Sequence, residues 1–340
     1  MAKFNFYFLK KAQTRVGLDI GHYNLKLAEL EKKGDSFKII NARMQDIRQV
    51  KNIPEAIKRI LKEANISTKK VNISVSGENV VARYLSLPEM TEAELRKAMA
   101  FQLEDHIPFK PEEVYTDYYV LGEEGNLTNK IRVFLVATKK DLLEERARLV
   151  REAGLTPQVI TTDALALKNT FYFNYPSKNE ANVTLLNIGD KITNLLISRQ
   201  QIPYFVRDSR FGGDMITSLI QTKLQLEKKA AEEFKHNPKE ESPEISKITK
   251  ATFGNLVNEI FVSLDFYENL TEQKIDEIYI TGGTSQLLGL REFLEGYLNL
   301  KLIPLEPFKK FSFSPNISRE TITKLSPYFA VAVGLALEGF

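Results

Sequence analysis

The chain lacks several residue types on which common functional classes depend. It has no cysteine among its 340 residues, which excludes disulfides, cysteine-based zinc sites and a thiol nucleophile. Its three histidines, His22, His106 and His236, are too few and too scattered for a histidine-rich metal site. The formal net charge is only +3, so the chain carries no general footprint of a nucleic-acid-binding protein.

Long apolar runs and the familiar nucleotide motifs are also missing. No stretch reaches the roughly 18 consecutive apolar residues that a transmembrane helix needs, and the apolar N-terminal segment is too short for a signal peptide. We therefore expect a cytoplasmic protein. The chain contains neither a GxxxxGK[ST] phosphate loop nor a GxGxxG turn after a strand. A nucleotide site, if present, must be built from other loops.

What the chain does contain is a repeated strand-and-turn pattern. Residues 16–21 (VGLDIG) and 185–190 (LLNIGD) are both apolar runs in which a polar residue, one apolar residue and a glycine follow in order. Residues 278–284 (IYITGGT) form a third strand-like run that ends in glycines. Together with a length that favours two domains, these loops indicate two similar half-molecules that close on a nucleotide.

The regular elements predicted around these loops follow the same order in both halves. Strands are expected at 16–20, 25–30 and 37–40 in the first half and at 183–188, 194–198 and 202–207 in the second. Each half therefore starts a mixed sheet. Residues 80–157 predict an inserted β-α-β-β-α unit, whose first helix begins with a capping box of Thr91 and Glu94.

Glycine turns of this kind suit phosphate binding, because glycine lets the backbone amides approach an anion closely. Ordinary hairpin turns are the alternative for either loop taken alone. Asp19 offers a carboxylate to Mg²⁺, expected through water because this ion keeps much of its hydration shell. Further phosphate contacts are expected from the turn residues Gly17, Gly21, Asn24, Lys26 and Gly189.

The order of these loops resembles the actin-like ATPase superfamily. Within it, the chain is most similar to the PilM family of type IV pilus assembly proteins, and more distantly to the cell-division protein FtsA. The residues that carry the resemblance are 82–88 (ARYLSLP), 104–109 (EDHIPF), 264–267 (LDFY) and 280–290.

The resemblance implies an actin-like (ribonuclease H-like) α/β fold with two lobes, each a mixed β-sheet with helices. Subdomain 1A of the first lobe is then expected at 1–79, 158–200 and 322–340. The inserted subdomain 1C is expected at 80–157, and the second lobe (2A/2B), with the adenosine loop, at 201–321.

The resemblance also implies roles for single residues around ATP or ADP with Mg²⁺. Asp19 would hold the magnesium shell, and Asp163 would orient the attacking water. The other expected nucleotide contacts are phosphate caps at Gly21, His22, Gly189 and Asp190, a floor at Gly212 and Gly213, and adenosine contacts at Glu232, Lys235, Gly282, Gly283 and Thr284.

Three positions depart from the family pattern. His22 stands where Ser or Thr is usual, Asn187 where the second loop has Asp, and Thr161 where an acidic residue is often found. Backbone donors and Asp19 remain for binding. Because phosphoryl transfer depends on positioning and electrostatic stabilisation, the loss of the carboxylate at 187 predicts at most weak ATPase activity.

The function implied is a cytoplasmic ATP-binding scaffold of the pilus inner-membrane complex, with a role in twitching motility. It would bind the N-terminal cytoplasmic segment of a PilN-like membrane protein in a nucleotide-dependent way, near residues 80–87 and 91–106. Other assembly components such as the motor, and self-association, are further expectations, and contact with the membrane would be indirect.

Two alternatives remain open from the sequence. An FtsA-like filament protein would need a C-terminal amphipathic membrane helix, which does not follow the last predicted helix at 328–337. A small-molecule kinase of the same fold would need a catalytic carboxylate in the cleft, for which Asp163 is the candidate, beside a sugar-binding cluster that is not evident.

Overall fold

The computed structural model describes residues 13–123, 129–236 and 243–340. Its first sheet consists of β1 (Gln13–Ile20), β2 (Asn24–Lys33), β3 (Ser36–Asp46), β4 (Lys70–Val75), β8 (Thr156–Thr162) and β14 (Ser312–Phe313). The spatial order is β14-β3-β2-β1-β4-β8. β1, β2 and β3 form an antiparallel meander, and β4 and β8 continue from β1 in parallel.

The second sheet repeats this plan. It consists of β9 (Val183–Ile188), β10 (Thr193–Arg199), β11 (Ile202–Ser209), β12 (Glu277–Thr281) and β13 (Leu302–Pro304), in the order β11-β10-β9-β12-β13. β9, β10 and β11 are again an antiparallel meander, and β12 and β13 are again parallel additions. The two predicted half-molecules are therefore confirmed as an internal structural repeat.

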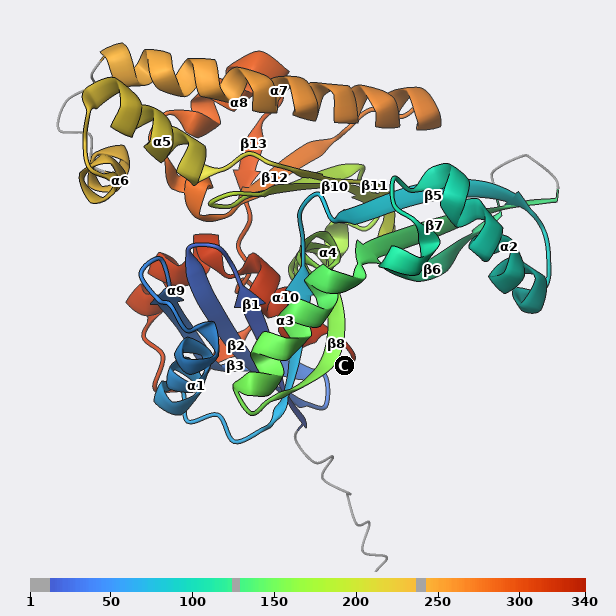
Figure 1. Ribbon diagram of the computed structural model, residues 1–340, viewed down its shortest axis with the longest axis horizontal. Coiled ribbons are helices and arrows are strands. Elements are labelled where there is room, and N and C mark those ends of the chain that lie inside the picture. The colour runs from blue at the N-terminus through green and yellow to red at the C-terminus, as the bar shows by residue number, and fades with distance from the viewer. Residues whose placement is uncertain (1–12, 124–128, 237–242) are drawn as a thin grey trace, which may run out of the picture.

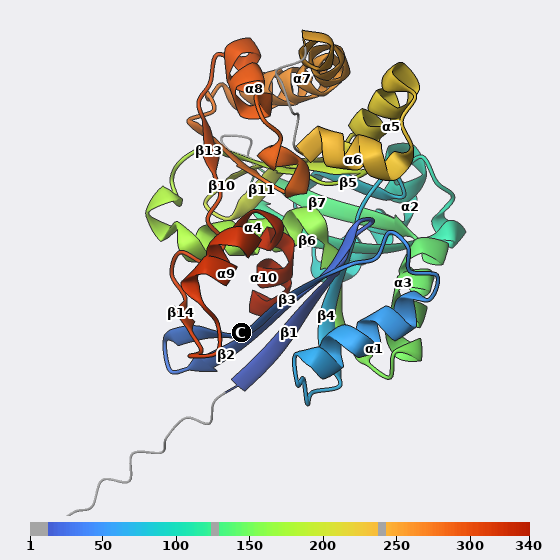
Figure 2. The same ribbon diagram turned by 90° about the vertical axis from the view of Figure 1, so that its left-hand side faces the viewer.

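Two helices lie between the sheets, α4 (Asp163–Asn174) and α10 (Ala330–Leu337), as Figure 2 shows. Their backbones approach so closely that only glycine fits at the contact. A Cβ on Gly334 would lie 1.7 Å from the carbonyl oxygen of Ala166, and one on Gly17 would lie 2.2 Å from that of Ala332. Gly17 therefore lets α10 pack directly on β1.

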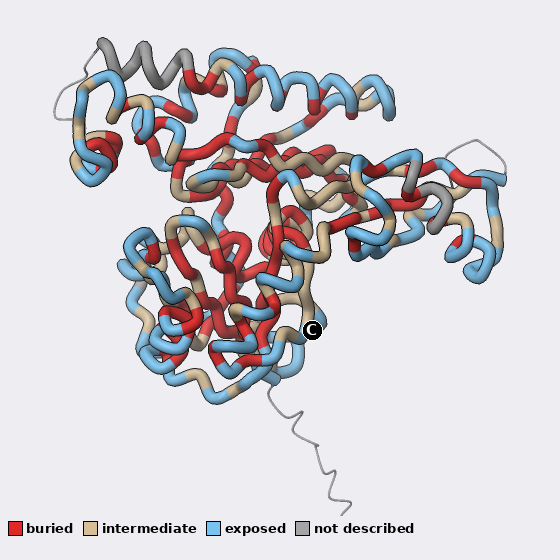
Figure 3. The backbone as a smooth tube through the Cα atoms, in the orientation of Figure 1, coloured by how far each residue is buried: buried red, intermediate tan, exposed pale blue. Residues whose placement is uncertain are grey.

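The remaining helices cover the outer faces of the two sheets. They are α1 (Ile53–Glu63) and α3 (Lys140–Glu152) on the first sheet, and α5 (Gly213–Leu224), α6 (Lys228–His236), α7 (Pro243–Thr271) and α8 (Leu290–Leu298) in the second lobe. The short α9 (Arg319–Leu325) instead packs on the same core cluster as α10. Apolar residues of α5, α7 and α8 meet the inner strands of the second sheet in one core cluster. Buried backbone accordingly concentrates around the two sheets (Figure 3).

The inserted unit projects to the side of both lobes (Figure 1). Its sheet contains β5 (Val80–Pro88), β6 (Val114–Glu123) and β7 (Lys130–Lys139) in the order β5-β7-β6, with α2 (Glu92–His106) packed against it. The capping box forms as predicted: the Thr91 amide donates to Glu94 at 2.8 Å, and the Glu94 amide donates to Thr91 Oγ1 at 3.4 Å.

Three of the predicted boundaries differ from the structure. The segment 158–200 was expected in the first lobe, but β9 and β10 hydrogen-bond within the second sheet. β14, expected in the second lobe, pairs with β3. α3, expected in the inserted unit, packs on the first-lobe core through Val150. The chain crosses between lobes through α4, and strand patterns alone do not say which sheet a strand joins. Residues 1–12, included in subdomain 1A, lie outside the described residues.

Candidate functional site

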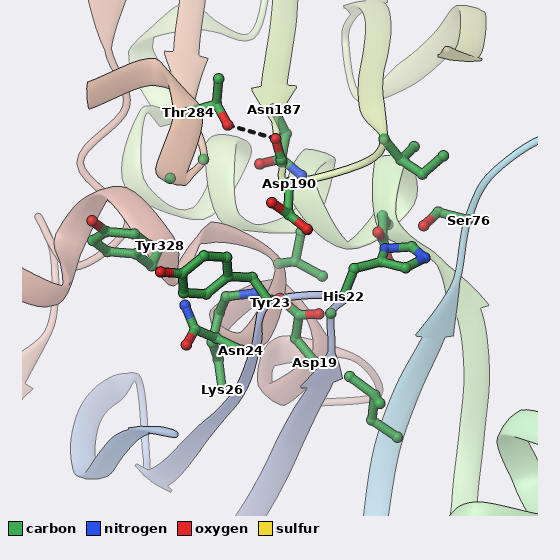
Figure 4. Close-up of a pocket in the computed structure, with 18 of the residues that line it drawn as sticks. Asp19, His22, Tyr23, Asn24, Lys26, Ser76, Asn187, Asp190, Thr284 and Tyr328 are labelled. Atoms are coloured by element: carbon green, nitrogen blue, oxygen red, sulfur yellow. Dashed lines mark hydrogen bonds and ion pairs between the residues drawn. The ribbon is translucent and has the colours of Figure 1, made fainter. Parts of the chain in front are cut away.

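Two hairpin turns from the two lobes face one cavity of about 360 Å³ (Figure 4). The β1–β2 turn is closed by the Gly21 amide, which donates to the carbonyl of Asn24 at 3.1 Å. The β9–β10 turn is closed in the same way, from the Gly189 amide to the carbonyl of Ile192 at 3.0 Å. The two glycine amides are therefore engaged inside their own turns, and the next amide in each turn belongs to His22 or Asp190.

The second turn is fastened by its neighbours in the second lobe. Thr284 Oγ1 donates to the Gly189 carbonyl at 2.6 Å, and the Gly213 amide donates to the same carbonyl at 3.1 Å. The Gly282 loop approaches so closely that a Cβ on Gly282 would lie 2.3 Å from the Ile188 carbonyl oxygen, and its φ is +95°. A larger residue at 282 would displace the loop from the turn.

The cavity brings together most of the residues predicted from the sequence. Those that line it are Asp19, Gly21, His22, Asn24, Lys26, Asp163, Asn187, Gly189, Asp190, Glu232, Lys235, Gly282, Gly283 and Thr284. Gly17, Gly212 and Gly213 are not part of its lining. Gly17 packs under α10, and Gly212 and Gly213 support the second turn from behind, where a Cβ on Gly212 would lie 2.2 Å from the Asp190 carbonyl oxygen.

On the first-lobe side, a buried ion pair sits at the base of the cavity. Lys26 Nζ lies 2.7 Å from Asp19 Oδ2, and Asp19 is 7% exposed. Burial and the neighbouring cations Lys191 and Arg146 lower the pKa of His22, so this imidazole is neutral at physiological pH. His22 adds a hydrogen-bonding group to the cavity without adding charge.

Asp163 lies where the first turn faces α4. Ser74 Oγ donates to Asp163 Oδ1 at 2.6 Å. Burial raises the pKa of Asp163, and the charge of Asp19 adds to this effect. Burial also raises the pKa of Asp190, with a further contribution from Asp214. The cavity thus holds two carboxyl groups whose charged forms are disfavoured, Asp163 and Asp190, which suits a site that takes up a cation or positively charged group.

The predicted adenosine pair is a buried salt bridge. Lys235 Nζ lies 2.7 Å from Glu232 Oε1 and donates to Thr217 Oγ1 at 2.9 Å. Burial alone would raise the pKa of Glu232, but hydrogen bonds from His236, Lys235 and Thr217 outweigh it and lower the pKa to about 2. Both side chains line the cavity, and their charged ends form an ion pair with each other.

Several cavity residues were not found from the sequence. Tyr23 and Tyr328 present rings to the cavity (Figure 4), and Arg146 Nη1 donates to the Ile20 carbonyl at 2.6 Å. The Arg48 guanidinium lies 4.0 Å from the Tyr23 ring centroid. Tyr23 lies within the predicted turn and could have been noted, but Arg146 reaches the site only because α3 folds back onto the first lobe.

Within the described residues, no group of three or more His, Cys, Asp or Glu side chains could hold a metal ion. A magnesium ion here would need ligands beyond the protein, such as phosphate oxygens and water, with Asp19 as the carboxylate closest to the first turn. Mg²⁺ is a hard ion that prefers oxygen ligands, so an oxygen donor such as the Asp19 carboxylate fits a magnesium ion whose other ligands are phosphate oxygens and water.

A second concavity of about 600 Å³ lies away from the first, bounded by the inserted sheet, the first lobe and the β10–β11 turn of the second lobe. β6 and β8 both line it, and each is the outer strand of its sheet in the described part of the chain. Thr161, one of the three positions that depart from the expected pattern, lines this groove and not the first cavity. Tyr119 of β6 is 70% exposed there, and Tyr115 is 45% exposed.

The chain matches a family model described as "Type IV pilus assembly protein PilM" over residues 17–340. Among solved structures, it is similar to one titled "PilM-PilN type IV pilus biogenesis complex", with a TM-score of 0.85 and 26% identity over 96% of this chain and 98% of that chain.

More distant structures share the fold alone. MreB5 of Spiroplasma citri bound to ADP matches with a TM-score of 0.53 and 11% identity, over 95% of this chain and 94% of that one. The ethanolamine utilization protein EutJ from Carboxydothermus hydrogenoformans matches with a TM-score of 0.57 and 12% identity, over 96% and 90%. The predicted actin-like fold is confirmed. None of the helices described in residues 13–123, 129–236 and 243–340 has the length and hydrophobicity needed to cross a bilayer.

Proposed function

The chain belongs to the PilM family of type IV pilus assembly proteins, and from that premise we propose that it is an ATP-binding, actin-like scaffold of the pilus assembly complex. The observation that carries the proposal is the cavity between two matching glycine turns, one from each lobe. A nucleotide held there contacts both lobes at once and thereby fixes their relative position.

The phosphates are assigned to the two turns. Because the Gly21 and Gly189 amides close their turns, the donors offered to phosphate oxygens are the following amides, of His22 and Asp190. Lys26 adds a positive charge from β2. The close approach of Gly282 to the Ile188 carbonyl supports the assignment, since it leaves a narrow backbone-lined cradle that a Cβ would fill.

Magnesium is assigned to the Asp19 side of the cavity. When bound, the ion would neutralise phosphate charge. Asp19 is held in place by Lys26 at 2.7 Å, so its carboxylate is oriented before any ligand arrives.

Turnover is proposed to be slow. Asn187 places a neutral amide where the family pattern has Asp. The carboxyl group of Asp163 has a pKa that is raised by burial and by the charge of Asp19. Asn187 therefore supplies no negative charge to an attacking water, and burial disfavours the charged form of Asp163. The site is therefore better suited to hold ATP than to hydrolyse it.

The adenosine is assigned to the wall formed by α6 and the Gly282 loop. The Glu232–Lys235 salt bridge stiffens α6 against α5 through Thr217. Gly283 lies against the Tyr328 ring, where a Cβ would come within 3.0 Å of it, so this corner combines an aromatic face with exposed backbone.

The partner is assigned to the second groove. The similar structure of a PilM–PilN complex motivates a PilN-like N-terminal segment as the occupant. Within residues 13–123, 129–236 and 243–340, β6 and β8 each have one edge without a strand partner, and an extended peptide can add to such an edge while its side chains fill pockets. The proposed partner site is therefore at the β6 edge of the inserted sheet. The sequence predicted a site near residues 80–87 and 91–106, which belong to β5, at the opposite edge of that sheet, and to α2. The protein would reach the inner membrane through that partner.

The experiment measures binding of a labelled N-terminal peptide of a PilN-like protein by fluorescence anisotropy. Tyr119→Glu puts a charge into the groove at a side chain that is 70% exposed, and Tyr297→Glu makes the same change on α8 at 65% exposure, away from the groove. We expect Tyr119→Glu to weaken the peptide at least tenfold and Tyr297→Glu to leave its Kd unchanged. Equal affinities for both variants would place the partner elsewhere.

A further inference from the structure

A row of polar side chains leaves the nucleotide cavity and crosses the second sheet. Asn187 on β9, Asn194 on β10 and Asp208 on β11 lie directly opposite one another in the strand register. Asn187 Nδ2 donates to Asn194 Oδ1 at 2.8 Å, and Asn194 Nδ2 donates to Asp208 Oδ1 at 2.7 Å. The cavity is thus connected to the far strand of the sheet by two consecutive side-chain hydrogen bonds.

The last residue of this row, Asp208, contacts the segment that leads from β4 into the inserted sheet. The backbone amide of Gly77 donates to Asp208 Oδ2 at 2.7 Å. Gly77 links β4 to β5 with φ +104°, a conformation that L side chains rarely adopt, and its carbonyl accepts the amide of Val80 that begins β5. Both carboxylate oxygens of Asp208 are therefore used, one towards the cavity and one towards β5.

The carboxylate sets the direction of the whole row. An ionised Asp accepts hydrogen bonds and donates none, so Asn194 must turn its NH₂ group towards Asp208 and its oxygen towards Asn187. Asn187 must then turn its own NH₂ group towards Asn194. Its Oδ1 is left at the cavity side, beside Gly282, where a Cβ on Gly282 would lie 2.7 Å from it. Asn187 thereby presents an oxygen acceptor, as an Asp would, while the negative charge sits at 208.

The inference builds on the proposed function. We propose that Asp208 is a positioning residue that orients Asn187 in the nucleotide cavity and, through Gly77, couples nucleotide binding to the peptide groove of the inserted sheet. β6, which lines that groove, belongs to the same three-stranded sheet as β5.

Few charged groups surround Asp208 among the residues that the structure describes. Val80 of β5, Phe134 of β7 and Thr162 of β8 line a small cavity beside it. Asp163 of α4 is the charged group that acts on it, and Arg210 and Glu78 form an ion pair beside the Gly77 turn. Burial raises the pKa of Asp208 to about 7, with a smaller contribution from Asp163. A protonated Asp208 would donate through one oxygen and could no longer accept from both Asn194 and Gly77.

The test measures a coupling ratio, the Kd of the labelled peptide without nucleotide divided by its Kd with saturating Mg·ATP. We expect at least fivefold coupling in the wild type at pH 8, within the usual range for coupled sites, and less than twofold in Asp208→Asn. The Asn side chain offers one acceptor instead of two, so it must release Asn194 or Gly77. Asn194→Leu breaks the row in the middle but keeps the Asp208–Gly77 bond, and it should lose coupling as well.

The pH profile separates positioning from a merely structural role. Coupling in the wild type should fall as the pH is lowered from 8 to 6, whereas Asp208→Asn should stay uncoupled throughout. Full coupling in a folded Asp208→Asn, or a flat wild-type profile, would overturn the inference while the proposed function stands. A wild type that binds neither Mg·ATP nor the peptide would instead contradict the proposed function.

Discussion

Lys235→Met removes one partner of a buried ion pair at the wall of the cavity. Lys235 and Glu232 are 9% and 6% exposed, with 2.7 Å between the charged atoms. Met keeps most of the apolar stem, so the main loss is the charge and its hydrogen bonds to Glu232 and Thr217. Leaving a buried carboxylate without its cation typically costs about 3–5 kcal/mol.

The lowered pKa of Glu232 points to a similar magnitude. Its pKa falls from 4.5 to about 2 on folding, since its hydrogen bonds outweigh the opposing effect of burial. A lowering of that size corresponds to roughly 3 kcal/mol of stability. Because the folded pKa lies below the unfolded one, this stability is present above about pH 4.5 and is lost as the pH falls towards 2.

The assay is thermal melting followed by far-UV circular dichroism. Lys235→Met should lower the melting temperature at pH 7 by roughly 4–7 °C. The gap to the wild type should narrow as the pH is lowered from 5 towards 3. The double variant Glu232→Gln/Lys235→Met removes the stranded charge and should recover most of the loss. A single variant that melts with the wild type, or a double variant no better than the single, would refute the assignment of a buried, mutually dependent pair.

Three further predictions concern Asn187 before the second turn, the Gly282 loop and the helix contact between the sheets. Asn187→Asp should raise ATP turnover at least severalfold by adding a negative charge to the cavity; steady-state phosphate release that stays at the wild-type rate would show that another group limits hydrolysis. Gly282→Ala should weaken ATP binding about tenfold or more in titration calorimetry, since its Cβ would lie 2.3 Å from the Ile188 carbonyl oxygen, and wild-type affinity would mean that the loop does not shape the site. Gly334→Ala should destabilise the fold by at least about 2 kcal/mol, because its Cβ would lie 1.7 Å from the Ala166 carbonyl oxygen, whereas Gly296→Ala on α8, with open space around it, should cost nothing; equal melting of the two variants would contradict the close α4–α10 packing.

The local parts of the fold and site were predictable because their signals lie within a few residues. The two hairpins, the Gly282 loop and the Thr91 capping box each depend on neighbouring positions, and the structure has all of them. The repeat pattern put residues 183–188 and 194–198 in the second half, where β9 and β10 lie, whereas the lobe boundary at residue 200, which came from the family resemblance, put them in the first lobe.

Cavity residues that depend on packing between distant parts of the chain could not be identified from the sequence. Arg146 and Tyr328 enter the cavity through tertiary packing of α3 and of the segment before α10. Gly17 was assigned to the phosphates because a glycine beside a turn suits both roles. Its place under α10, where a Cβ would lie 2.2 Å from the Ala332 carbonyl oxygen, shows that it serves helix packing instead.

The central claim is that the cavity between the two glycine turns holds an adenine nucleotide with magnesium. Titration calorimetry of the folded wild type with ATP, with and without Mg²⁺, tests it most directly. We predict saturable binding of one nucleotide per chain that is strengthened by Mg²⁺, with the magnesium effect lost in Asp19→Ala. Folded protein that gives no binding heat with ATP or ADP at several temperatures would contradict the claim.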